Sequence, residues 1–154
     1  MRLLIELKVL RNKIGVDDVV DELFDKAMQL MQSGNFSEAI SCYNKILEVA
    51  PKSLVARLNK GNAYKEMGLF EKADECFELL LKDEPDYCDA WNNKGVMLAT
   101  QEKYSESIIC FDRATEIAPH DINAWNNKGL ALQKLGEDTE ANKCFMTADS
   151  LQRQ

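Results

Sequence analysis

Apolar residues recur along the chain at the spacing of one helix face, in stretches paired around short turns. Residues 54–67 form one such stretch, residues 68–70 the turn, and residues 71–84 the next stretch. Pro85 cannot continue that helix, because proline lacks an N–H and clashes with the preceding helical turn. The pattern predicts a chain built from pairs of amphipathic helices.

The helix pair belongs to a repeat of 34 residues, and four residue types keep this interval. They are Pro51, Pro85 and Pro119; Gly61, Gly95 and Gly129; Trp91 and Trp125; and Cys42, Cys76, Cys110 and Cys144. Such self-similarity is typical of repeat architectures, in which neighbouring units stack to bury their apolar faces. We therefore expect four repeats, at 20–53, 54–87, 88–121 and 122–154, each holding two helices.

Glycine stands between the two predicted helices of three repeats, as Gly34, Gly68 and Gly136. Glycine ends a helix at low cost because it tolerates a positive φ angle. The third repeat carries Glu102 at this place. We expect its turn to form at some local cost in backbone strain.

The pattern resembles the tetratricopeptide repeat (TPR) family, whose preferred residues are spread over the whole 34-residue unit. Repeat 3 matches them most fully. At the family's preferred positions it has Trp91, Lys94, Gly95, Leu98, Ser107, Phe111, Ala114 and Pro119, of which only Lys94 departs from the usual residue. Two features depart from the family: Arg57 replaces the tryptophan in repeat 2, and lysine replaces the usual leucine at Lys60, Lys94 and Lys128. We expect these lysines to pack their stems on apolar neighbours and keep their charges in water.

The resemblance implies an all-α fold, a right-handed superhelical solenoid of four stacked TPR motifs preceded by an N-terminal segment. It also implies that the first helix of each repeat, here called the A helix, lines a concave groove. The second, or B, helix faces outward. The groove implies a protein–protein interaction module, in the manner of an adaptor or scaffold, and no enzymatic activity.

Two features mark the ends of the array. Helix B of the last repeat has Asn142 and Asp149 where repeat 1 has Ile40 and Leu47, which predicts a capping face; the alternative is sequence drift. Residues 1–19 precede the repeats. Their apolar residues fit a helix or a period-two strand, and we expect this segment to cap repeat 1 or to join a second copy. The second option makes a self-associating scaffold the alternative function.

Composition excludes several classes of function. The 154 residues carry 19 Lys and Arg against 26 Asp and Glu, a net charge of −7, which disfavours nucleic acid and anionic membranes as partners. No stretch is apolar enough to span a membrane, and five cysteines fit a reducing compartment, so we expect a cytoplasmic protein. His120 is the sole histidine, and the periodic cysteines lie too far apart for a disulfide. The sequence thus predicts no metal, no cofactor and no catalytic residues.

The groove positions of the A helices carry a row of asparagines in repeats 2 to 4, with two candidates in each. The candidate ligand-binding residues are Asn59, Asn62, Asn92, Asn93, Asn126 and Asn127. Because an amide both donates and accepts hydrogen bonds, such a row suits the backbone of an extended peptide. The alternative is that these amides solvate the surface or bond to one another.

Some members of the family hold an acidic peptide terminus with a carboxylate clamp of two asparagines and three basic residues. Asn62 and Asn93 match the two asparagines of that clamp. The basic positions hold Leu58, Asn123 and Asn127, so we expect no capture of chaperone tails. Near repeat 1, Phe24, Met28 and Met31 form an apolar alternative surface, unless the N-terminal segment covers it.

Overall fold

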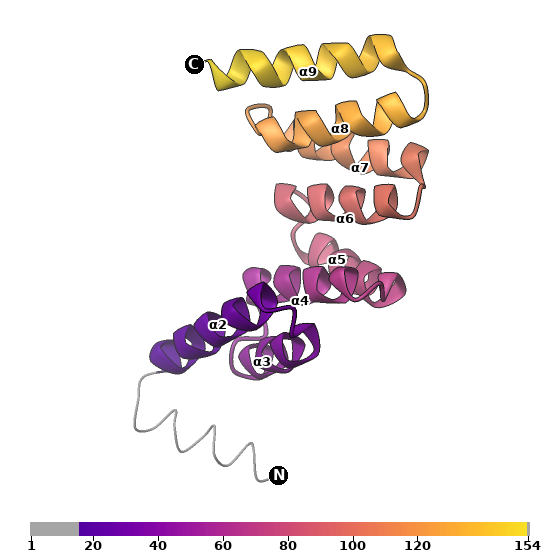
Figure 1. Cartoon of the computed structure of the whole chain (residues 1–154). Coiled ribbons are helices and arrows are strands. Elements are labelled where there is room, and N and C mark those ends of the chain that lie inside the picture. The colour runs from indigo at the N-terminus through magenta and orange to yellow at the C-terminus, as the bar shows by residue number, and fades with distance from the viewer. Residues whose placement is uncertain (1–15, 154) are drawn as a thin grey trace. The chain divides into compact units, whose positions relative to one another are not determined.

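The structure, a computed structural model, describes residues 16–153, and these form eight α-helices and no strand. The helices are α2 (Val16–Gln32), α3 (Phe36–Val49), α4 (Leu54–Glu66), α5 (Phe70–Asp83), α6 (Cys88–Thr100), α7 (Tyr104–Ile117), α8 (Ile122–Lys134) and α9 (Asp138–Gln152). Figure 1 shows them in chain order, coloured from indigo to yellow. The predicted all-α fold of helix-turn-helix repeats is confirmed, with α2, α4, α6 and α8 as the A helices.

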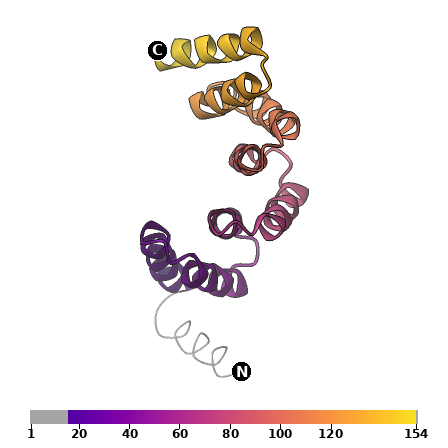
Figure 2. The ribbon, with the colours of Figure 1, turned by 45° about the vertical axis from the view of Figure 1, so that its right-hand side comes forward.

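The chain divides into two compact units, residues 1–76 and 77–154, and the boundary falls inside α5. In the first unit α3 packs against α2 and against α4. In the second, α6 packs on α7, α7 on α8 and α8 on α9, and α6 also touches α8 (Figure 2). The contact between α6 and α8 brings two successive A helices side by side.

The turns between A and B helices form as expected. Gly34, Gly68 and Gly136 have φ angles of +76°, +71° and +81°. Glu102 takes the same backbone conformation, with φ of +60°, and is the sole non-glycine residue with positive φ among residues 16–153. The backbone at Glu102 therefore bears the strain that the sequence predicts.

The core of the first unit centres on Tyr43, which is buried against Ala27, Ala39 and Ile46. Phe24 tilts onto this ring, with 6.3 Å between the ring centroids. Small residues at Ala27 and Ala39 allow α2 and α3 to approach, and the large aromatic ring fills the space beside them.

The core of the second unit depends on two pairs of glycine and phenylalanine. Gly95 on α6 faces Phe111 on α7, and Gly129 on α8 faces Phe145 on α9. A Cβ atom at Gly95 would lie 2.6 Å from Phe111 Cε1, and one at Gly129 would lie 2.5 Å from Phe145 Cε1. Glycine at these two positions therefore allows each pair of helices to pack as closely as observed, because any side chain would clash with the phenylalanine ring.

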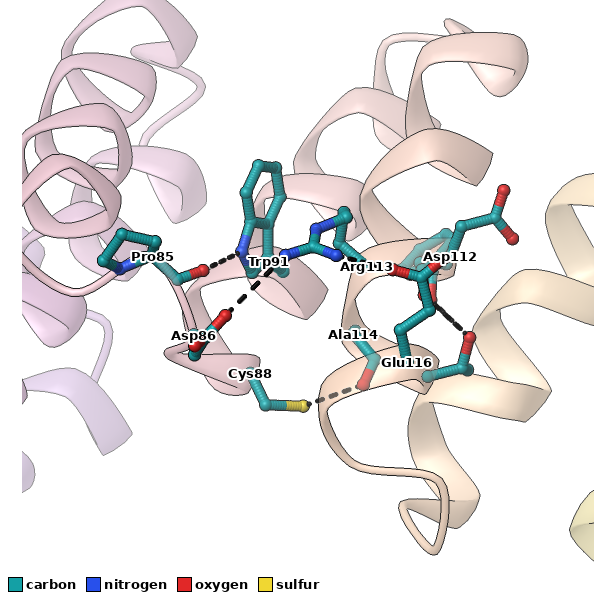
Figure 3. A network of polar contacts seen from close by, with 10 residues as sticks. Pro85, Asp86, Cys88, Trp91, Asp112, Arg113, Ala114 and Glu116 are labelled. Atoms are coloured by element: carbon teal, nitrogen blue, oxygen red, sulfur yellow. Dashed lines mark hydrogen bonds and ion pairs between the residues drawn. The ribbon is translucent and has the colours of Figure 1, made fainter.

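In repeats 2, 3 and 4 a hydrogen bond joins the start of the A helix to the proline before it. The indole Nε1 of Trp91 donates to the Pro85 carbonyl at 2.7 Å (Figure 3), and that of Trp125 donates to the Pro119 carbonyl at 2.9 Å. In repeat 2, Arg57 Nη2 makes the same bond to the Pro51 carbonyl at 2.7 Å. Arg57 departs from the family in residue type but keeps the hydrogen bond.

The lysines that replace leucine are half-buried, and two of them form ion pairs. Lys94 pairs with Glu78, and Lys128 Nζ lies 2.6 Å from Asp112 Oδ1. Each pair joins an A helix to the B helix of the preceding repeat. The packing of their stems on apolar neighbours stays a prediction, whereas these two charges are neutralised by carboxylates and are not left to water alone.

Three expectations about the ends and the whole array stay predictions. Asn142 and Asp149 are exposed on α9, which agrees with a polar face there but leaves its capping role a prediction. The expected N-terminal helix or strand falls on residues 1–19. Residues 16–19 belong to α2, and residues 1–15 lie outside the described residues, so the role of this segment in capping or self-association stays a prediction. The right-handed superhelix is a property of the complete array, and it also stays a prediction.

Candidate functional site

The six predicted asparagines lie on three A helices. Asn92 and Asn93 stand on α6, Asn126 and Asn127 on α8, and Asn59 and Asn62 on α4 in the other unit; all six are half-buried. Because α6 and α8 are neighbours, the structure brings Asn92 and Asn127 together.

Asn127 Nδ2 donates a hydrogen bond of 3.0 Å to Asn92 Oδ1. This bond links successive A helices, so part of the row does bond to itself, as the alternative interpretation proposed. Each amide has two N–H donors and an oxygen with two lone pairs. After the bond, Asn127 keeps one N–H and its oxygen, and Asn92 keeps both N–H groups.

The other asparagines differ in what surrounds them. No hydrogen bond links the side chains of Asn59, Asn93 or Asn126 to another residue within 16–153. Asn62 Oδ1 is buried and also finds no hydrogen-bond donor in that part of the chain. These amides retain bonding capacity that the folded repeats do not use.

A pocket of about 310 Å³ opens beside the Asn92–Asn127 pair, between α6 and α8. Its apolar lining comes from Val96, Ala99, Phe111, Leu130 and Ala131, and its polar lining from Thr100, Tyr104, Asn127 and Lys134. Leu130 is 53% exposed although it is apolar. The amides can be identified from the sequence but this pocket cannot, since its walls come from three helices, α6, α7 and α8.

Lys134 carries the single formal charge among the residues that line this pocket. It lies in the last turn of α8 and is exposed. No ion pair to Lys134 is found within the described part of the chain. The pocket therefore combines an apolar lining, the Asn127 amide with its remaining N–H and oxygen, and one positive charge without an ion-pair partner among the described residues.

A second pocket, of about 470 Å³, lies on a different face of α8, between α7 and α9. Trp125, Leu132 and Ile108 form its apolar part. Its four charged residues are paired among themselves, as Lys128 with Asp112 and Lys143 with Glu140. This pocket has no unpaired charge with which to select a ligand.

The apolar surface predicted near repeat 1 is only partly present. Phe24 and Met31 pack against the core of the first unit, whereas Met28 is 52% exposed.

The positions that would supply the basic residues of a carboxylate clamp carry no positive charge. Leu58 is buried, and Asn123 and Asn127 are uncharged.

The cysteines form no disulfide, and Cys42, Cys110 and Cys144 are buried. Burial raises the pKa of the Cys76, Cys88 and Cys144 thiols. In Cys88 the nearby Asp121 carboxylate adds to this effect, and the pKa rises to about 11. Thiols with raised pKa values are poor nucleophiles at neutral pH.

Among the described residues no cluster of three or more His, Cys, Asp or Glu side chains is arranged to hold a metal ion.

The fold and the paired A helices place the chain among all-α helical repeat proteins. Three sequence models, each described as a tetratricopeptide repeat, match residues 30–94, 88–121 and 122–154. The chain belongs to the tetratricopeptide repeat family. This family is in general one of binding proteins, and membership supports a protein–protein interaction module.

Solved structures show the same fold at low sequence identity. MamA 41-end from Desulfovibrio magneticus RS-1 is 19% identical with a TM-score of 0.75, over 96% of this chain and 82% of that one. Pseudomonas aeruginosa pilF is 24% identical with a TM-score of 0.78, over 90% and 64% of the two chains. The first TPR of Spaghetti (RPAP3), bound to the HSP90 peptide SRMEEVD, is 24% identical with a TM-score of 0.68, over 77% and 94%.

A comparison with curated protein sequences found no match. Within the described residues, no helix combines the length and the apolar character needed to cross a membrane.

Proposed function

We propose that this chain holds an extended peptide segment of a partner protein on the face formed by its A helices, through the asparagine row and without a basic clamp. The observation that supports this most is the Asn92–Asn127 pair, whose remaining donors and acceptor lie beside an open pocket. A peptide in extended conformation has backbone N–H and C=O groups that need such partners.

The asparagine row suits a backbone better than it suits a charged group. Asn92, Asn93, Asn126 and Asn127 carry no charge, so they offer moderate hydrogen bonds in both directions. The solved complex of a TPR with an HSP90 peptide supports peptide binding as the general mode. The absence of basic residues at Leu58, Asn123 and Asn127 argues that the partner here differs from an acidic chaperone tail.

The test replaces one amide in each of repeats 2, 3 and 4, as Asn59→Ala, Asn93→Ala and Asn127→Ala in one protein, and measures partner recovery from native lysate. A hydrogen bond contributes about 0.5–1.5 kcal/mol, so losing three should weaken binding by about tenfold or more. Recovery should fall accordingly, while circular dichroism shows a folded protein.

The matched control removes three amides from the B helices, as Asn44→Ala, Asn142→Ala and Gln152→Ala, all of which are exposed. This control should keep full recovery. Equal recovery by the folded groove variant and the wild type would contradict the proposed binding face.

A further inference from the structure

We propose that the pocket between α6 and α8 selects the peptide's sequence: it takes one large apolar side chain that stands next to a single carboxylate. This inference rests on the proposed function, since the peptide must first lie on the A-helix face. It adds the chemistry of the ligand, which the asparagine row alone does not specify.

The positions of the residues along the two helices place the amides and the pocket in line. Asn127, Leu130 and Lys134 follow one another at spacings of three and four residues, so they share one face of α8. On α6, Asn92 and Val96 are four residues apart, so they also share one face of their helix. A peptide whose backbone bonds to the amide pair therefore presents its neighbouring side chain to the pocket.

The size and lining of the pocket favour one apolar side chain. Its volume of about 310 Å³ corresponds to roughly ten water molecules. Water beside Val96, Ala99 and Leu130 finds few polar partners, so an apolar side chain that displaces it gains free energy. Leu130 is 53% exposed, and such a ligand would cover this exposed part of its side chain.

Charge complementarity identifies the neighbouring group. Lys134 is the one charged residue of the lining, and it has no ion-pair partner among the described residues. A carboxylate one or two residues from the apolar side chain reaches this ammonium group. Because the whole chain carries a net charge of −7, a long acidic tract would be repelled, and a single carboxylate is favoured.

The experiment selects ligands from a phage library of random twelve-residue peptides on the full folded chain, then measures the binding of selected synthetic peptides by fluorescence anisotropy. We expect enrichment of Leu, Ile, Met or Phe adjacent to Asp or Glu. Leu130→Ala should weaken binding by roughly four- to fifteenfold, since a ligand would bury about half of the leucine side chain. Lys134→Glu should weaken it by up to about fivefold and shift the preference to Lys or Arg.

Two control variants make the same chemical changes elsewhere. Met146→Ala removes the most exposed apolar side chain of α9, and Lys82→Glu makes the same charge change on α5. Neither should alter binding. The effect of Lys134→Glu should also shrink in high salt, because an exposed ion pair is screened.

The outcomes separate this inference from the proposed function. Peptides that lose affinity in the asparagine variant but not in Leu130→Ala or Lys134→Glu would overturn the pocket's role and leave groove binding intact. A selection without apolar or acidic preference would overturn it as well. If no library peptide bound the folded chain above background, both proposals would be rejected.

Discussion

A single residue type separates the third turn from the other three, because all four turns share one backbone conformation. Glu102 holds φ at +60°, whereas glycine takes the equivalent angle at Gly34, Gly68 and Gly136. A side chain with a Cβ atom is strained in this region by about 1–2 kcal/mol. Glu102 is exposed, and its side chain makes no hydrogen bond to another described residue that would offset the strain.

We predict that Glu102→Gly stabilises the protein. The gain should be about 0.5–1 kcal/mol, because relief of strain exceeds the greater freedom of glycine in the unfolded chain. For a chain of this length, the melting temperature should rise by about 1–4 °C, as measured by circular dichroism.

Two variants separate strain from charge. Glu102→Gln removes the charge but keeps the strained backbone, so it should not raise the melting temperature. Gly136→Ala introduces the strain where no atom lies within 4 Å of the new Cβ, so it should lower the melting temperature. A rise in Glu102→Gln equal to that in Glu102→Gly would show that charge, not backbone strain, is responsible.

At the scale of the helix, each repeat of the second unit is closed by a glycine on helix A facing a phenylalanine on helix B. Gly95 with Phe111 and Gly129 with Phe145 repeat the same geometry. Interiors packed at this density tolerate no added methyl group without displacement of a neighbour. The missing Cβ atom at Gly95 and Gly129 therefore sets how closely helices A and B of each repeat can pack.

We predict that Gly95→Ala destabilises the protein. The new Cβ atom would lie 2.6–2.9 Å from three atoms of the Phe111 ring. Overpacking costs about 1–3 kcal/mol, and the higher helix propensity of alanine returns about 1 kcal/mol, so the net loss should be up to about 2 kcal/mol. Urea unfolding monitored by circular dichroism measures this loss.

A double-mutant cycle with Phe111→Leu tests the cause of that loss. In the Phe111→Leu background the ring atoms are gone, and Gly95→Ala should become neutral or stabilising through helix propensity alone. If Gly95→Ala cost as much in this background as in the wild type, contact with the ring would not explain the loss.

The sequence predicts helices more fully than it predicts the site. The ends of α4 and α5 fall within one residue of the predicted bounds, since Gly68 and Pro85 stop helices by local backbone geometry. The pocket and the Asn92–Asn127 bond depend instead on how α6 and α8 approach each other. Such contacts join residues 35 positions apart, and a list of groove positions cannot specify them.

At the scale of the whole molecule, thiols with raised pKa values occur in both compact units, as Cys76 in the first and Cys88 and Cys144 in the second. Burial is the main cause in each case. Cys88 is the furthest shifted, and its thiol donates toward the Ala114 carbonyl at 3.5 Å (Figure 3). An unfolded cysteine has a pKa of about 8.5, so folding favours the protonated thiol.

This difference predicts that alkaline pH destabilises the fold. Because the pKa of Cys88 is higher in the folded protein, the folded state binds the proton more tightly than the unfolded state does. The stabilisation it contributes is complete below about pH 8.5. It is lost progressively as the pH rises from there through about 11, the pKa in the folded state.

The measurement compares wild type with Cys88→Ser by urea unfolding at pH 8 and pH 10. Serine keeps a donor for the Ala114 carbonyl but does not ionise in this range, so tyrosines and lysines titrate alike in both proteins. The wild type should lose more stability than Cys88→Ser between the two pH values. Equal losses would mean that the Cys88 thiol does not couple folding to pH, because every other titrating group is shared.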